Sequence, residues 1–165
     1  MAPVTNSFEF TSPIAPARFF KAGILHMHEI ATQVMPGVIK SASISGDGSV
    51  GTTKEYHFTE EYINNTGGAY KHVKDRTDAL DKENFVCKYT IVEGGTLGTT
   101  YKAASHTFEF KPAANGGTLF KATTELEPLD GQEYSKEEES KAKEGMMGVY
   151  KAVEAYLLAN PTAFA

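Results

Sequence analysis

The sequence predicts an α+β fold in which one curved antiparallel sheet wraps around a long C-terminal helix. Between residues 38 and 126, short runs rich in β-branched and aromatic residues alternate with glycine and asparagine, which is the pattern of an antiparallel meander. Residues 135–159 contain no proline and are rich in Glu, Lys and Ala, which favours one long helix. The length of 165 residues fits a single domain that spans residues 1–165.

One short strand and two short helices are predicted before the meander. Residues 8–11 alternate apolar and polar side chains, as a half-buried strand does. Two prolines within residues 12–16 then mark the start of a helix, expected over residues 15–22. A second helix is expected over residues 28–34, before Pro36 and Gly37 end the pair.

The meander itself is predicted to contribute six strands. Turns separate them, and all but the turn at residues 81–84 contain glycine, which tolerates positive φ where a hairpin needs it. The expected strands cover residues 39–45, 52–59, 70–80, 85–92, 101–110 and 119–126. Together with the N-terminal strand they make one curved sheet.

The C-terminal helix is predicted to lay one apolar stripe against that sheet. Ser135 and Glu138 have the spacing of a capping box at its start. Apolar residues then recur at intervals of three and four, at Ala142, Met146, Val149, Val153, Tyr156 and Leu157. A curved sheet crossed by a helix and closed at one end by two short helices leaves an internal apolar space, where small ligands bind.

Composition and charge restrict the cellular location and the classes of binding partner that we expect. A lone cysteine, Cys87, cannot form an internal disulfide, which favours a reduced, cytoplasmic location. No apolar run reaches the length of a membrane span and no basic cluster precedes an apolar run at the N-terminus, so we expect neither membrane insertion nor secretion. The net charge of −5, with lysines scattered among acids, argues against a nucleic-acid partner.

Four stretches, in this order and at these intervals, resemble a known family. They read SPIAPARFFKA at residues 12–22, GDGSVG at 46–51, VKDR to YTIVEGG within 73–95, and KAVEAYLLANP at 151–161. The chain resembles, from end to end, the plant pathogenesis-related class 10 family, to which the birch-pollen major allergen belongs.

That resemblance implies a seven-stranded sheet of the helix-grip type with a large cavity. Relatives accept flavonoids, cytokinins and other hormones, steroids, fatty acids and alkaloid-like compounds, and act in plant defence and stress responses. Two departures keep ligand preference from being carried over: an extended hairpin tip at residues 62–69, and His28 where relatives often carry an acid.

Strand parity, the inner face of the helix and the family resemblance together predict the residues that line the cavity. Methionine adapts to different guests, while Tyr, His and Ser supply orienting polar contacts. The predicted ligand-binding residues are Ile24, His28, Val38, Tyr56, Phe58, His72, Tyr89, Ile91, Ser105, Met146, Met147 and Tyr150.

No cofactor or metal is expected. The loop at residues 46–51 is glycine-rich, but it lacks the lysine and the following helix of a phosphate-binding loop, so a rigid turn is the better interpretation. His26 and His28 are two residues apart, a spacing that does not place both on one helix face, and the other histidines lie in separate strands.

Two catalytic alternatives stay open, with Lys54, Lys143, Glu154 and Tyr156 as polar candidates. Ribonuclease activity has been attributed in relatives to positions that match Lys54, Glu154 and Tyr156, but Lys102 stands where an acid is expected. A condensing or cyclising enzyme of specialised metabolism would need a buried lysine with a lowered pKa, for which Lys54, Lys102 or Lys143 qualify.

The leading hypothesis is a cytoplasmic carrier, buffer or sensor of small amphipathic plant metabolites or hormones that performs no covalent chemistry. A pure interaction or storage protein is the third possibility, and it would bind no small molecule saturably. The chain is expected to be a monomer or a weak dimer.

Overall fold

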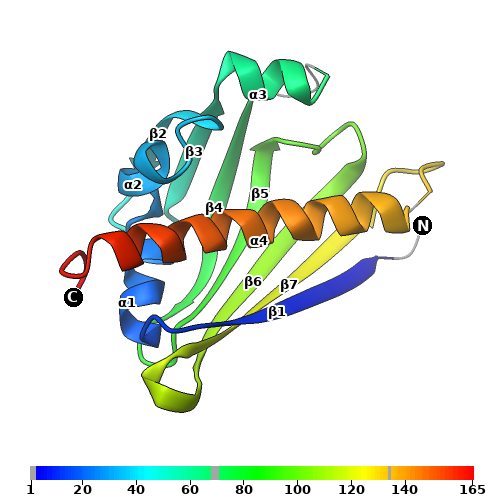
Figure 1. The fold of residues 1–165 in the computed structure, drawn as a ribbon. Coiled ribbons are helices and arrows are strands. Elements are labelled where there is room, and N and C mark those ends of the chain that lie inside the picture. The colour runs from blue at the N-terminus through cyan, green and yellow to red at the C-terminus, as the bar shows by residue number, and fades with distance from the viewer. Residues whose placement is uncertain (1–2, 68–70, 134) are drawn as a thin grey trace.

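The computed structural model describes residues 3–67, 71–133 and 135–165, and within them one seven-stranded antiparallel sheet accompanies a long helix (Figure 1). The strands are β1 (Val4–Ser12), β2 (Ile39–Ser45), β3 (Thr53–Phe58), β4 (His72–Asp81), β5 (Val86–Gly94), β6 (Tyr101–Pro112) and β7 (Thr118–Pro128). The helices are α1 (Pro16–Phe20), η1 (Lys21–Leu25), α2 (Met27–Val34), α3 (Glu60–Asn65), η2 (Ala114–Gly116) and α4 (Lys136–Ala159). The predicted α+β class is confirmed.

The sheet is curved around α4. Its strands follow the order β1-β7-β6-β5-β4-β3-β2, so the first two strands of the chain form its opposite edges. The pairing of β4 with β5 shifts register between Lys74 and Asp75 and again between Thr77 and Ala79. Such irregularities bend a strand and increase its twist. The sheet therefore forms a concave face, across which α4 runs (Figure 1).

The segment that joins the two edge strands closes one end of the sheet. Pro16 lies in the first turn of α1, where its missing N–H costs nothing, and Phe19 and Phe20 are buried. The chain continues directly into η1, which has the wide turns of a π-helix, and then into α2. The two helices expected at residues 15–22 and 28–34 are thus present, the first as α1 with η1 and the second as α2, and the non-helical residue His26 separates them.

The long helix α4 begins as the sequence predicts. The Ser135 hydroxyl accepts a hydrogen bond from the Glu138 N–H at 3.3 Å, which caps the first turn. Tyr150, Val153 and Leu157 are buried, and they all lie in the second half of the helix. The second half of α4 therefore packs on the sheet, while the first half spans a less filled region.

An aromatic cluster fills the end of the concave face that α1 covers. The ring of Phe120 lies 4.6 Å from that of Tyr150 and 5.1 Å from that of Phe110, centroid to centroid. Phe19 and Phe108 complete a fully buried set around them. Offset and edge-to-face aromatic contacts of this kind stabilise a core beyond the area that they bury.

Two elements differ from the sequence-based expectation. The N-terminal strand β1 covers nine residues, not only residues 8–11, and alternates between exposed and half-buried side chains along its length. The predicted hairpin tip at residues 62–69 is in part the helix α3, capped by the Thr59 hydroxyl, which accepts from the Tyr62 N–H at 3.2 Å. Gly68 and Ala69 of that tip, and Tyr70 of the expected fourth strand, lie outside the described residues.

None of the described helices is long and apolar enough to cross a membrane.

Candidate ligand-binding cavity

A cavity of about 1160 Å³ lies between the concave face of the sheet and α4. Its walls come from the inner faces of the strands, the turn between η1 and α2, the helix α3, the loop at residues 95–100 and the first half of α4. Ligand pockets commonly measure about 300–1,000 Å³. The cavity is therefore large enough for a small molecule with several rings.

Strand alternation explains why the cavity lies at one end of the concave face. On β6, every second side chain points inward, so Ala104 and His106 line the cavity while Phe108 and Phe110 continue the same face into the aromatic cluster. Along this single strand, the inward side chains change from small and polar ones to large aromatic ones. The space that the aromatic rings fill at one end stays open at the other.

Eight of the predicted ligand-binding residues line this cavity, and so do Lys54 and Lys143. They are Ile24, Val38, Tyr56, Phe58, Tyr89, Ile91, Met146 and Tyr150. Tyr150 marks the boundary of the cavity with the core: its ring packs on Phe120, and its hydroxyl lies 3.5 Å from the Gly23 carbonyl oxygen. The contacts of these residues with a ligand remain a prediction.

Two predicted strand residues have the wrong parity and lie outside the lining. His72 is on the outer face of β4, where its ring stacks on His57 at 5.8 Å and its Nε2 lies 3.4 Å from Glu93. Ser105 points outward from β6, and its hydroxyl donates to a Glu125 carboxylate oxygen at 3.4 Å. Their neighbours Val73 and His106 line the cavity in their place.

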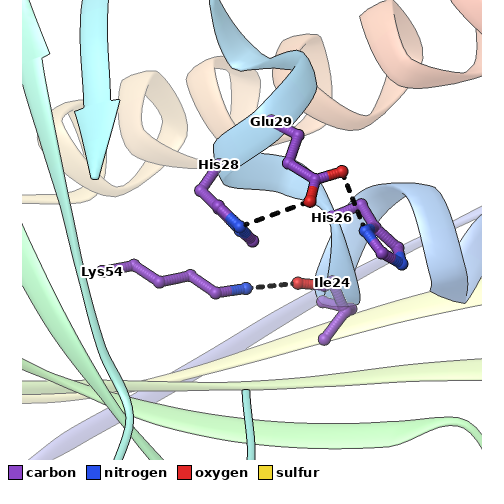
Figure 2. Close-up of polar contacts among 5 residues, drawn as sticks. All are labelled: Ile24, His26, His28, Glu29 and Lys54. Carbon is purple, nitrogen blue, oxygen red and sulfur yellow. Dashed lines mark hydrogen bonds and ion pairs between the residues drawn. The ribbon is translucent and has the colours of Figure 1, made fainter. Parts of the chain in front are cut away.

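Two predicted helix residues are also outside the lining. Met147 follows Met146 on α4, and a helix turns about 100° per residue, so only Met146 faces the cavity. His28 on α2 is not among the residues that line the cavity. Its Nδ1 is buried without a hydrogen-bond partner among the described residues, and its Nε2 is 3.8 Å from a Glu29 carboxylate oxygen (Figure 2).

The positions that match the proposed ribonuclease residues do not converge. Lys54 lines the cavity, whereas Glu154 and Tyr156 lie outside the lining, and Tyr156 packs against the core. One Glu154 carboxylate oxygen is buried without a hydrogen-bond partner in the described part of the chain. Lys102 lies outside the lining and near two acids, 3.4 Å from Glu127 and 3.6 Å from Asp130.

The strongest polar feature of the cavity wall is Lys54. Its Nζ donates a hydrogen bond to the Ile24 carbonyl oxygen at 2.6 Å, near the end of η1, where helix carbonyls lack intrahelical partners (Figure 2). Asp75 lies directly opposite Lys54 in the register of β3 and β4, and it also lines the cavity. Lys54 and Asp75 are thus cross-strand neighbours in a largely apolar cavity wall.

Burial shifts the pKa values of both groups toward their neutral forms. The pKa of Lys54 is lowered by loss of hydration, although Asp75 acts in the opposite direction. The pKa of the Asp75 carboxyl is raised by burial from its ordinary value of 3.8 to about 7, against the attraction of Lys54. Near neutral pH, Asp75 can therefore both donate and accept a proton.

Three further polar groups of the inner wall, those of Tyr56, Tyr89 and His106, are uncharged near neutral pH. Burial raises the pKa of the Tyr56 and Tyr89 phenols and lowers that of His106 to about 4. The His106 Nδ1 lies 2.9 Å from the Thr124 hydroxyl. These groups are neutral hydrogen-bonding partners for a ligand.

Sequence reasoning missed Asp75, His106 and Cys87 as wall residues. Cys87, predicted as a packing residue, is buried and lines the cavity, and burial raises the pKa of its thiol to about 12. Asp75 could have been found from the alternation of Val73, Asp75 and Thr77, which all face inward.

Among the residues that the structure describes, no three or more His, Cys, Asp or Glu side chains gather where they could hold a metal ion.

Comparison with known proteins identifies relatives along the whole chain. The profile of the Pathogenesis-related protein Bet v 1 family matches residues 1–160. "Pathogenesis-related protein 1" of Asparagus officinalis is 43% identical over 159 residues, which cover 96% of each chain. "Major strawberry allergen Fra a 1.08" of Fragaria ananassa is 39% identical over 166 residues, covering 99% of each.

Solved structures share the fold. The structure of Ara h 8.0201 has a TM-score of 0.80 and 28% identity, covering 96% of this chain and 99% of its own. Norcoclaurine synthase from Thalictrum flavum has a TM-score of 0.71 over 95% of this chain and 87% of its own. At 18% identity, that second likeness concerns the fold alone.

Proposed function

Because this chain belongs to the Bet v 1 family of pathogenesis-related proteins, we propose that its cavity binds, stores or transports small amphipathic plant metabolites in the cytoplasm during defence or stress. The observation that carries this proposal is the cavity of about 1160 Å³, whose wall is mostly apolar by area and whose charged side chains, apart from Lys54 and Asp75, lie on α4. That composition is typical of sites that enclose an apolar ligand and orient it by a few hydrogen bonds.

The polar groups favour a ligand with at least one hydroxyl or carbonyl oxygen. Lys54 supplies a donor at the inner wall, and the neutral phenols of Tyr56 and Tyr89 can donate or accept nearby. Flavonoids, cytokinins and other hormones, steroids and alkaloid-like metabolites all combine rings with such oxygens or nitrogens. We propose that one of these classes is the natural ligand.

The ligand is proposed to enter between α3, the loop at residues 95–100 and the first half of α4. Asn65, Glu138 and Lys141 belong to the cavity lining and are exposed, which indicates that the cavity opens here. Lys143 and Glu139 form an ion pair at 3.0 Å along the same stretch of α4. Apolar side chains such as Tyr62 and Leu97 line the inner side of this opening.

A titration with an environment-sensitive apolar fluorophore tests the proposal. We expect saturable, single-site binding and displacement by one class from a panel of flavonoids, cytokinins, steroids, fatty acids and indole compounds at micromolar concentration. Absence of saturable binding would overturn the proposal and favour a protein that acts only through interactions with other macromolecules.

A second candidate function, a cavity enzyme of specialised metabolism, is favoured by one observation. Of the three lysines considered, only Lys54 is buried in the cavity wall, and it faces the carboxyl of Asp75. A nucleophile or base beside a group that titrates near neutral pH is an arrangement suited to proton transfer. Turnover of an added carbonyl compound and amine, lost in Lys54→Arg with probe binding retained, would establish this function; equal turnover in both proteins would exclude Lys54.

A further inference from the structure

The Lys54 amine is unusual for a lysine because it is buried and hydrogen-bonded but forms no direct ion pair among the described residues. Its Nζ donates to the Ile24 carbonyl oxygen at 2.6 Å, yet among the described residues no carboxylate oxygen lies within 4.0 Å of it. Most of the side chain is removed from water, which lowers its pKa. The side chain therefore lies at the wall of an apolar cavity with its amine positioned but not neutralised by a direct ion pair.

The groups around this amine come from four elements. Asp75 on β4 lies opposite Lys54, Tyr56 lies two residues along β3, and Cys87 on β5 lines the same cavity. His28 and Glu29 approach from α2 (Figure 2). Lys54 lowers the pKa of His28, while Asp75, Cys87 and Glu29 oppose the lowering of the pKa of Lys54. Of these neighbours, Asp75 is the carboxyl that shares the cavity wall.

We propose that Lys54 is a covalent capture site for small apolar aldehydes, which it binds reversibly as an imine with Asp75 as the acid and base. This inference rests on the proposed function in one respect, namely that the cavity admits small apolar molecules. A desolvated lysine in an apolar pocket is the recurring arrangement in proteins that form imines with carbonyl compounds.

The chemistry balances without an oxidant, a reductant or a cofactor. The neutral Lys54 amine attacks the aldehyde carbon and breaks the C=O π bond, and Asp75 relays the amine proton to the oxygen, which gives a carbinolamine. Asp75 then donates a proton to that hydroxyl, which leaves as water while the nitrogen lone pair forms the C=N bond of a protonated imine. The Asp75 carboxylate takes up the remaining N–H proton, which leaves the neutral imine and restores the Asp75 carboxyl. The net change is one aldehyde and one amine converted to one imine and one water, and the reverse steps release the aldehyde.

Lys143 and Lys102 do not combine a position in the cavity wall with an amine that is free of a direct ion pair. Lys143 forms a direct ion pair with Glu139 at 3.0 Å, which Lys54 lacks in the described part of the chain. Lys102, outside the cavity, has its pKa raised by Asp130 and Glu127. Protonated amines do not attack carbonyl groups, so capture in the folded protein is expected to select Lys54.

The test is reductive trapping of the full chain with benzaldehyde and sodium cyanoborohydride near neutral pH, followed by intact mass and peptide mapping. We expect one benzyl group, located on Lys54. Lys54→Arg is expected to lose this rapid labelling, whereas Lys102→Arg is expected to keep it. Asp75→Asn is expected to slow the labelling by at least about tenfold, because it removes the acid and base.

Labelling spread over the surface lysines, or unchanged labelling in Lys54→Arg, would overturn the proposal. Peptide mapping of the unaltered protein locates the label even if a variant fails to fold. Binding of the apolar fluorophore distinguishes the proposal of imine formation at Lys54 from the proposal that the cavity binds small molecules. If the protein binds the fluorophore but Lys54 stays unlabelled, only the proposal of imine formation is contradicted. A protein that does neither contradicts the proposed function as well.

Discussion

The guanidinium of Arg18 in α1 donates a hydrogen bond to the Leu157 carbonyl oxygen at 2.8 Å, and so ties the N-terminal helical segment to the end of α4. It donates two more, to the carbonyl oxygens of Asn160 at 2.7 Å and Ala163 at 2.8 Å. The last carbonyls of a helix have no intrahelical partner and carry partial negative charge. One arginine therefore caps α4 and fixes the closed end of the cavity.

Arg18→Ala is expected to destabilise the protein by about 1–3 kcal/mol, because three carbonyl oxygens lose their charged donor. Chemical denaturation measures the change. Arg18→Lys keeps the positive charge but not the planar group that reaches three acceptors, so its loss should be intermediate. A stability equal to that of the parent protein in Arg18→Ala would mean that these bonds contribute nothing.

Gly23→Ala is expected to lower stability by about 1–2 kcal/mol, because the added methyl group overpacks the boundary between core and cavity. A Cβ at Gly23 would lie 3.1 Å from Cε1 of Tyr150, whose ring is held against Phe120. Gly37→Ala is the matched control, since a Cβ there meets no atom within 4 Å. The same denaturation midpoint in the two variants would contradict this account of Gly23.

The pH dependence of stability should report on Asp75. Its pKa is raised by burial from 3.8 to about 7, so the folded state holds a proton through this range that the unfolded state has released. The resulting stabilisation is present at low pH and is lost as the pH rises toward and through 7. Relative to Asp75→Asn, the parent protein should lose up to about 4 kcal/mol of unfolding free energy between pH 4 and pH 8. Parallel curves for the two proteins would show that Asp75 ionises as it does in water.

The order and approximate bounds of most strands and helices could be predicted because the turns and caps that delimit them are local sequence patterns. Glycine turns separate the runs that become β2 to β7, except between β4 and β5, and the Ser135 cap with the apolar repeat beyond it predicts α4 almost to the residue. The helix α3, which forms part of the connection between β3 and β4, was not predicted. Thr59 with Glu60 and Glu61 is a helix start, but the following run of Asn, Thr and Gly is equally typical of a turn.

The candidate site was harder to predict because strand faces depend on register. Phe108 and Phe110 already mark the even-numbered residues of β6 as the inner face, which excludes Ser105 and includes His106. On β4, the register shift between Thr77 and Ala79 interrupts the alternation, so the inward positions change from Val73, Asp75 and Thr77 to Leu80. The Lys54 and Asp75 pair depends on the β3 to β4 register, a long-range property that single-residue preferences do not contain.

The central claim, that small apolar molecules bind between the sheet and α4, is tested most directly by a pair of neighbouring methionines. Met146 lines the cavity and Met147 does not. Met146→Glu places a carboxylate in the wall, which a bound apolar fluorophore would have to desolvate, so its affinity should fall at least about tenfold, or about 1.4 kcal/mol. Met147→Glu should bind the fluorophore as the parent protein does. Equal affinities in both variants, with both folded by circular dichroism, would contradict binding in this cavity.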